Sequence, residues 1–169
     1  TWYSPETIAA AVPAGLLNFT LMSVFIGTAV YVNTFVAQYY GAKRYHRIGP
    51  SVWQGLHFAF IAGVVVLPFY SIADKIFSLS AHAPEIQSLE VEYFRILLFC
   101  TFPLTAASAL GSFFAGRGKT WTVMWVNISS TATNIILDYG LIFGRWGLPE
   151  MGIKGAAVAT VSALFVRFF

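Results

Sequence analysis

Five long apolar stretches alternate with short polar ones along the chain. They span residues 7–40, 49–73, 94–116, 120–143 and 152–169. Four runs, 7–42, 48–73, 96–116 and 120–137, contain no Asp, Glu, Lys or Arg. Each run is near or above the roughly 18 residues that indicate a membrane-spanning helix. The pattern predicts an all-α integral membrane protein, a polytopic bundle of about five transmembrane helices.

Prolines and small residues refine this picture. About 20 residues cross a bilayer core, so the first stretch is over-long, and Pro13 predicts a kink or a helix that projects beyond the bilayer. Residues 83–94 have Pro84 at their start, after Ala83, and a mixed polar face, which predicts a short helix along the membrane surface. Small residues at four-residue spacing in the third and fifth crossings predict close helix packing. They are Ala107, Gly111, Ala115, Gly155, Ala159 and Ala163.

Composition and charge agree with a membrane location. The 169 residues are 57% hydrophobic and only 10% charged, against about 25% charged in a soluble domain. The basic residues lie in several short loops and form no basic face, so nucleic acid is not an expected partner. The loops at 43–47 and 117–119 are basic, whereas 74–92 is mainly acidic. By the positive-inside tendency, the two basic loops are cytoplasmic and 74–92 is external.

Two apparent motifs carry little chemistry. The sequence GRGKT at 116–120 resembles the end of a phosphate-binding loop, but Phe113 stands where that motif needs glycine and no strand precedes it. The histidines His46, His57 and His82 are not spaced to bind a metal with one another or with carboxylates. For His57, within a crossing, we expect a hydrogen bond to a neighbouring helix rather than a proton relay.

The fourth crossing contains a polar stripe. Asn127, Thr131, Asn134 and Asp138 follow spacings of 4, 3 and 4, which places them on one helical face. Asp138 has no charged residue within six positions on either side. An ionisable residue inside a membrane usually faces a cavity or the bundle interior. We therefore expect Asp138 and its neighbour Asn134 to have a function.

The first crossing has a weaker counterpart. Asn18, Met22, Phe25 and Asn33 share a face. A cavity lined by them would be mainly apolar with few polar groups, as is usual for a small-molecule site. For Met22 and Phe25 taken alone, packing between helices is the favoured interpretation.

Two segments resemble a known family. The sequence NTFVAQYYGAKRYHRIGPSVWQGL (33–56) is similar to the second helix, the cytoplasmic loop and the start of the third helix of the multidrug and toxic compound extrusion (MATE) transporters. The sequence NIILDYGLIFGRWGLPEMGIKGAAVAT (134–160) resembles their fifth helix, its outer loop and the entry to the sixth. Spacing and loop charges fit along all 169 residues.

The resemblance implies a twelve-helix transporter with two six-helix lobes around a central cavity. Residues 1–169 would be a partial N-terminal lobe, helices two to six with the sixth truncated, without the first helix and the second lobe. Asn134 and Asp138 match a family cation site, and Tyr93 and Thr160 match a tyrosine and a threonine near it. Sodium at Asp138 is the one metal ion that the resemblance allows. The aspartate that the first helix contributes in the family is not in this sequence.

The resulting expectation is a secondary antiporter in the inner (plasma) membrane of a bacterium or archaeon. It would export organic, often cationic, compounds in exchange for protons or sodium, without a cofactor. One alternative is a related flippase for lipid-linked sugars, which should have a far more basic cavity. A membrane-embedded enzyme would need a nucleophile with a base, or a metal cluster, and only one isolated acid is present. A structural membrane subunit is the remaining alternative.

Overall fold

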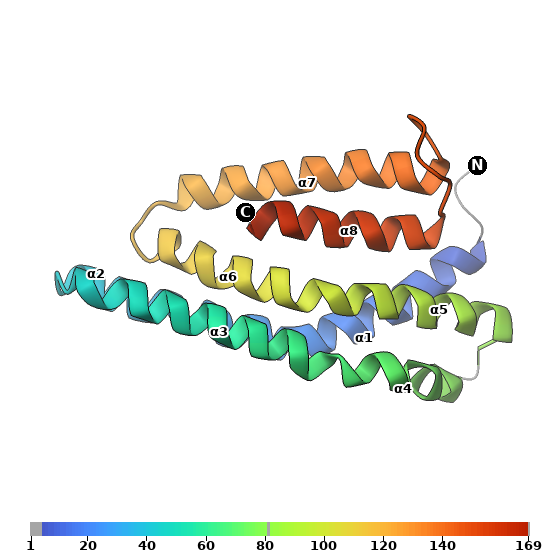
Figure 1. Cartoon of the computed structure of the whole chain (residues 1–169), viewed down its shortest axis with the longest axis horizontal. Helices are drawn as coiled ribbons and strands as arrows, with labels where there is room; N and C mark the ends of the chain where they lie inside the picture. Colours follow the sequence, from blue (N-terminus) through green and yellow to red (C-terminus); the bar gives the residue numbers. More distant parts are fainter. Residues whose placement is uncertain (1–4, 81, 169) are drawn as a thin grey trace.

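The chain forms a bundle of helices that run side by side along one long axis (Figure 1). The structure, a computed structural model, describes residues 5–80 and 82–168, and no strand occurs within these ranges. The helices are α1 (Pro5–Val30), α2 (Val32–Gly41), α3 (Ile48–Val66), α4 (Pro68–Phe77), α5 (Pro84–Leu97), α6 (Thr101–Ala115), α7 (Thr120–Phe143) and α8 (Ile153–Phe168). Short 3₁₀ turns lie at Tyr45–Arg47, Ser78–Ser80 and Leu98–Cys100.

The eight helices make five passes along the bundle, because three passes consist of two consecutive helices. The first is α1 with α2, interrupted at Tyr31, and the second is α3 with α4, interrupted at Leu67 before Pro68. The third is α5 with α6, joined by the turn Leu98–Cys100. The helix α7 and the helix α8 are the fourth and fifth passes. The predicted bundle of five crossings is therefore present, and α1 continues through Pro13.

Three helical stretches among the described residues are long and apolar enough to cross a membrane. They are Thr7–Gly41, Tyr45–Val66 and Pro84–Ala115. The helix α7 has 24 residues, about 36 Å at 1.5 Å per residue, which matches a bilayer in length. Its polar stripe makes it less apolar than the other three stretches.

The prediction of a surface helix at 83–94 is wrong. Residues Pro84–Leu97 form α5, which packs against α1, α4 and α8 and leads directly into α6. The polar side chains of this segment predict contact with water, but Glu90 is buried in the bundle. The third crossing thus begins ten residues earlier than predicted, and the connection between α4 and α5 is short.

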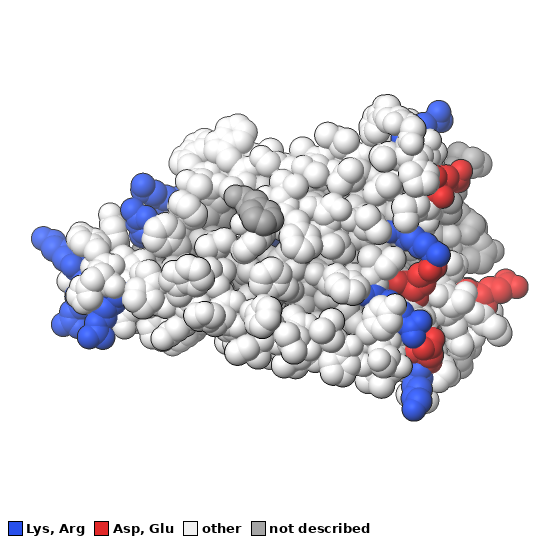
Figure 2. All heavy atoms as spheres, viewed as in Figure 1, with Lys and Arg blue, Asp and Glu red and all other residues white. Residues whose placement is uncertain are grey.

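Charges gather at the two ends of the bundle, and a broad band between them carries almost none (Figure 2). The end with α2 and the α6–α7 turn, here called the basic end, shows only Lys and Arg in this view. Its basic residues are Lys43, Arg44, Arg47, Arg117 and Lys119. The opposite end, called the mixed-charge end, has acidic and basic residues together. This distribution is the one expected of a helical bundle embedded in lipid with both ends in water.

Two ion pairs join helices at the mixed-charge end. Arg95 on α5 binds Asp74 on α4 at 2.5 Å and also donates to the backbone carbonyl of Tyr70 at 3.1 Å. Lys154 on α8 binds Glu92 on α5 at 2.5 Å. These contacts attach α4 and α8 to α5.

The helices α7 and α8 approach each other closely. Gly155, Ala159 and Ala163 of α8 are buried, as the small-residue stripe predicts. A Cβ atom built on Gly155 would lie 2.6 Å from the carbonyl oxygen of Leu141. The stripe on α6 is used differently, because Ala107, Gly111 and Ala115 line a cavity described below.

A hydrogen bond between side chain and backbone also links these two helices. The Ser130 hydroxyl donates to the carbonyl oxygen of Ala163 at 2.7 Å in a buried position. Interhelical hydrogen bonds in membrane proteins contribute about 0.6 kcal/mol on average, with a maximum near about 1.7 kcal/mol. Ser130→Ala should therefore lower the free energy of unfolding by about 0.6–1.7 kcal/mol in an SDS titration. The exposed Ser129→Ala on the same helix is the control and should change it little; equal values for both variants would contradict this role.

Candidate functional site

The predicted polar stripe of α7 has two parts with different surroundings. Asn134 and Asp138, near the mixed-charge end, are partly buried. Asn127 and Thr131, further along the same helix, are exposed and border an open groove of about 680 Å³. All four positions share a helical face as predicted, but neighbouring helices cover only one half of it.

The partly buried half presents a free donor and a free acceptor. The amide Nδ2 of Asn134 and the carboxylate Oδ1 of Asp138 are both enclosed, and neither has a hydrogen-bond partner among the described residues. An unsatisfied buried polar group costs about 1–3 kcal/mol, so such atoms are uncommon in native proteins and need an explanation. The two residues lie one helical turn apart. Asp138 Oδ1 can take a proton or coordinate a cation, whereas Nδ2 of Asn134 is a donor, so Asn134 would coordinate a cation only through its Oδ1.

Tyr93 lies on the same side of the bundle, on α5. Its ring packs against both apolar clusters that connect α1 with α5, one around Phe94 and the other around Met22. Asp138 and Cys100 are near enough to the Tyr93 hydroxyl to act on it electrostatically. The structure therefore brings Tyr93 and Asp138, which are 45 positions apart in sequence, into one neighbourhood.

Thr160 contributes from α8, the helix that packs along α7. It is partly buried, and its hydroxyl donates to the carbonyl oxygen of Ala156 at 2.9 Å. This bond uses the proton of the hydroxyl and leaves the oxygen lone pairs as acceptors. The structure shows no hydrogen bond from Thr160 to Asp138 or Asn134.

The predicted substrate-cavity residues do not form one group. Asn33 and Asn127 line a common cavity of about 470 Å³ between the first crossing, α6, α7 and the end of α8, together with Arg167. Met22 is 5% exposed in an apolar cluster, and Phe25 packs against another and lies 6.2 Å from the Phe58 ring. Asn18 is 3% exposed, and its Nδ2 has no hydrogen-bond partner in the part of the chain that the structure describes. Met22 and Phe25 thus pack between helices, which was the favoured interpretation for both.

The histidine expectations have two outcomes. His57 is exposed beside Trp53, at 6.0 Å between ring centroids, and makes no hydrogen bond to a described residue of another helix, so that prediction is wrong. His82 does pair with a carboxylate, because its Nδ1 lies 2.8 Å from Oε1 of Glu90. Within the described ranges, no group of three His, Cys, Asp or Glu side chains could hold a metal ion.

Glu90 is the polar residue that sequence reasoning missed. It is fully buried on α5, on the face that also buries Phe94 and Leu97. The spacing of these three residues, four and three, is the signal that could have identified it. A surface helix at 83–94 would place this acid in solvent, whereas the fold buries it.

Comparison with known proteins identifies the family. The MatE family model matches residues 1–140. The probable multidrug resistance protein NorM of Synechocystis is 29% identical over 99% of the chain, and the probable multidrug resistance protein YoeA of Bacillus subtilis is 32% identical over 99%. The chain spans 36% of the length of each of these relatives.

Solved structures agree on the fold. The crystal structure of MATE in complex with MaD3S superimposes with a TM-score of 0.88 over 98% of this chain and 37% of that one, at 23% identity. An inward-facing conformation of a multidrug resistance MATE family transporter gives 0.86 over 96% of this chain and 36% of that one, at 23% identity. The helical bundle, its apolar band and the match over 140 residues together show that the chain is an integral membrane protein of the MatE family.

Proposed function

We propose that this chain is part of the N-terminal lobe of a secondary antiporter that exports organic compounds in exchange for protons or sodium. Membership of the MatE family supports transport, and the relatives named above are described as multidrug resistance proteins. Because the chain spans 36% of those relatives, the remaining helices would come from the rest of a longer polypeptide. Its five passes correspond to helices two to six of that lobe.

The observation that carries the proposal is the carboxylate oxygen of Asp138 on α7, buried and unpartnered within the described ranges and one turn from Asn134. Asn134 Nδ2 and Asp138 Oδ1 are buried, one turn apart, and without a hydrogen-bond partner among the described residues. Hard cations such as sodium take oxygen ligands, by analogy with Ca²⁺ and Mg²⁺. Carboxylate, amide and hydroxyl oxygens are available from Asp138, Asn134, Tyr93 and Thr160. A proton on Asp138 would neutralise the same carboxylate.

Coupling follows if the bundle packs differently with and without the bound cation. A charged, unpaired carboxylate in an apolar surrounding is costly, and binding a cation removes most of that cost. The cation therefore favours whichever helix arrangement encloses Asp138, and the exported compound favours the arrangement that opens its own cavity. Each ligand then weakens the binding of the other by the same factor.

The exported compound would bind where the helices leave space. The cavity of about 470 Å³ is lined largely by apolar side chains, and its polar lining includes Asn33, Asn127 and Arg167. This volume is within the range of small-molecule sites, and apolar walls with a few amides suit an aromatic organic compound. Asn33 Oδ1 is buried and has no hydrogen-bond partner in residues 5–80 and 82–168, which leaves an acceptor for a ligand donor.

The test is transport by the complete transporter in proteoliposomes, with ethidium as the organic cation. A proton gradient and a sodium gradient are imposed separately, and ethidium movement is followed by fluorescence. We expect one of the gradients to drive ethidium against its own concentration gradient, and an uncoupler of that ion to stop it. Movement that responds to neither gradient would overturn the antiport proposal, and movement of a lipid-linked saccharide instead would favour a flippase.

A further inference from the structure

A second acid is enclosed in the bundle, away from the site on α7. Glu90 lies on α5, six residues after Pro84, which is about 9 Å along the helix axis. Its side chain is 0% exposed. The helices α1, α4 and α8 pack against α5 and enclose this position. Nothing in the proposed exchange on α7 uses Glu90.

The two carboxylate oxygens of Glu90 have different surroundings. Oε1 lies 2.8 Å from Nδ1 of His82. Oε2 is buried and has no hydrogen-bond partner among the described residues. An ionised carboxylate in an apolar interior needs hydrogen bonds to both oxygens to offset its lost hydration. His82 supplies only one, so the burial of the ionised carboxylate is only partly offset.

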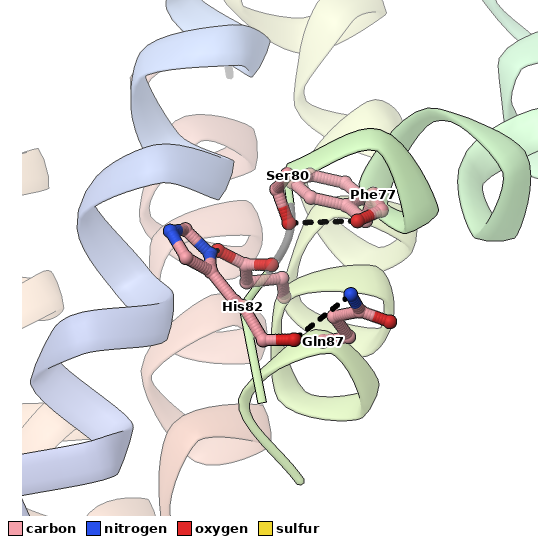
Figure 3. A network of polar contacts seen from close by, with 5 residues as sticks. Phe77, Ser80, His82 and Gln87 are labelled. Carbon is pink, nitrogen blue, oxygen red and sulfur yellow. Dashed lines mark hydrogen bonds and ion pairs between the residues drawn. The ribbon is translucent and has the colours of Figure 1, made fainter. Parts of the chain in front are cut away.

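His82 stands between this carboxyl group and water. It lies in the turn between α4 and α5, and its side chain is 41% exposed. Two hydrogen bonds fix the turn, one from Gln87 Nε2 to the His82 carbonyl at 3.0 Å and one from the Ser80 hydroxyl to the Phe77 carbonyl at 2.7 Å (Figure 3). The imidazole is therefore held with Nδ1 on the buried carboxyl while part of its ring meets solvent.

The other charged groups near this end have partners of their own. On α4, Asp74 is bound to Arg95, and Lys75 is exposed. On α8, Lys154 is bound to Glu92. The titratable side chains of α4, α5 and α8 further include Tyr70, Glu85, Tyr93 and Arg167. In α1, residues 7–30 contain no titratable side chain, and Glu6 lies outside the described side chains. Of these groups, His82 alone forms a described hydrogen bond or ion pair with Glu90.

We propose that Glu90 is a proton-binding site distinct from Asp138, and that His82 transfers protons between it and the solution at the mixed-charge end. A proton from water adds to Nε2 of the neutral imidazole and gives an imidazolium ion. The proton on Nδ1 then passes to Oε1 of Glu90, which leaves a neutral imidazole and a protonated carboxyl. The reverse sequence releases the proton, and no other reactant is needed. Histidine is suited to this step because its unperturbed pKa, about 6.5, is close to neutral.

This site would exchange protons whether or not the chain transports ethidium, because its geometry does not depend on Asn134 or Asp138. The proton-binding role of Glu90 is therefore independent of the antiport proposal. Its test needs a measurement on the protein itself rather than a transport assay. Infrared difference spectroscopy detects the carbonyl stretch of a protonated carboxylic acid. A buried carboxyl is distinguished from exposed ones by this band and by slow exchange with D₂O.

The first arm of the test concerns Glu90. The complete transporter in lipid vesicles is titrated from high to low pH, and Glu90→Gln should remove one buried carboxyl band that Asp138→Asn leaves in place. Glu85→Gln, on the exposed first turn of α5, is the matched control and should keep this band. A Glu90→Gln spectrum identical to that of the unmodified protein would overturn the proposal.

The second arm concerns His82 and leaves Glu90 intact, so it applies even where Glu90→Gln does not accumulate. His82→Gln keeps a hydrogen-bond donor near Oε1 but cannot carry a proton. After a pH jump, the Glu90 band should shift in frequency and appear at least about tenfold more slowly, a conservative figure for losing a positioned proton-transfer group. His46→Gln, an exposed histidine at the basic end, should change neither property. An unchanged rate with His82→Gln would overturn the relay, and an unchanged frequency would overturn the contact.

Discussion

Asp138→Asn should strongly reduce gradient-driven ethidium export while leaving the protein folded. The substitution keeps the shape of the side chain and removes its negative charge, so no cation is needed to neutralise it. The preferred packing around α7 then no longer depends on the ion. We expect the gradient-driven rate to fall by about 5–150-fold, the range that corresponds to a coupling free energy of 1–3 kcal/mol. Initial rates in proteoliposomes at matched protein content measure it.

Two further measurements separate coupling from general damage. Glu85→Gln removes an exposed acid from the first turn of α5 and should leave the rate near that of the unmodified protein. Ethidium binding to Asp138→Asn in detergent, without any gradient, should persist. A rate within twofold of normal for Asp138→Asn would mean that the carboxylate has no part in coupling, whatever the transporter exports.

Asn134 and Asp138 show which part of the candidate site can be predicted from the sequence. Their one-turn spacing on a helix is a local property, so the sequence predicts the pairing, and the structure encloses both side chains. The same spacing extends the face to Asn127 and Thr131, yet these two are exposed beside an open groove. Which part of a helix face is covered depends on the neighbouring helices, and a single helix's periodicity does not contain that information.

Glu90 shows the opposite case. Its neighbours in sequence include Glu85, Glu92 and Arg95, so the local average is polar and predicts a surface helix. The fold instead pairs Glu92 with Lys154, Arg95 with Asp74 and Glu90 with His82, all from other segments, and leaves Glu85 exposed. A long apolar run indicates a membrane crossing whatever the neighbouring helices are. A segment that begins a crossing with many polar residues, such as α5, can be recognised only when the positions of the neighbouring helices are known.

Gly155 lies in a helix contact whose existence the sequence predicts but whose partner only the fold identifies. The small-residue stripe of α8 indicates close packing, but not which neighbour approaches. In the structure a Cβ on Gly155 would lie 2.6 Å from the carbonyl oxygen and 2.7 Å from the carbonyl carbon of Leu141. That carbonyl also accepts the Met151 amide at 2.8 Å, so it belongs to the α7–α8 connection. A backbone group cannot rotate away as a side chain could.

Gly155→Ala should therefore destabilise the protein, although alanine is the better helix former. Added volume in a tight contact costs about 1–3 kcal/mol, and we expect the upper part of this range because the obstacle is backbone. Helix propensity alone would stabilise by about 1 kcal/mol. Gly27→Ala on α1 measures the effect of helix propensity alone, since a Cβ there meets nothing within 4 Å. The free energy of unfolding in SDS should thus fall for Gly155→Ala and rise for Gly27→Ala. A rise for both variants would show that α7 and α8 can move apart without a loss of stability.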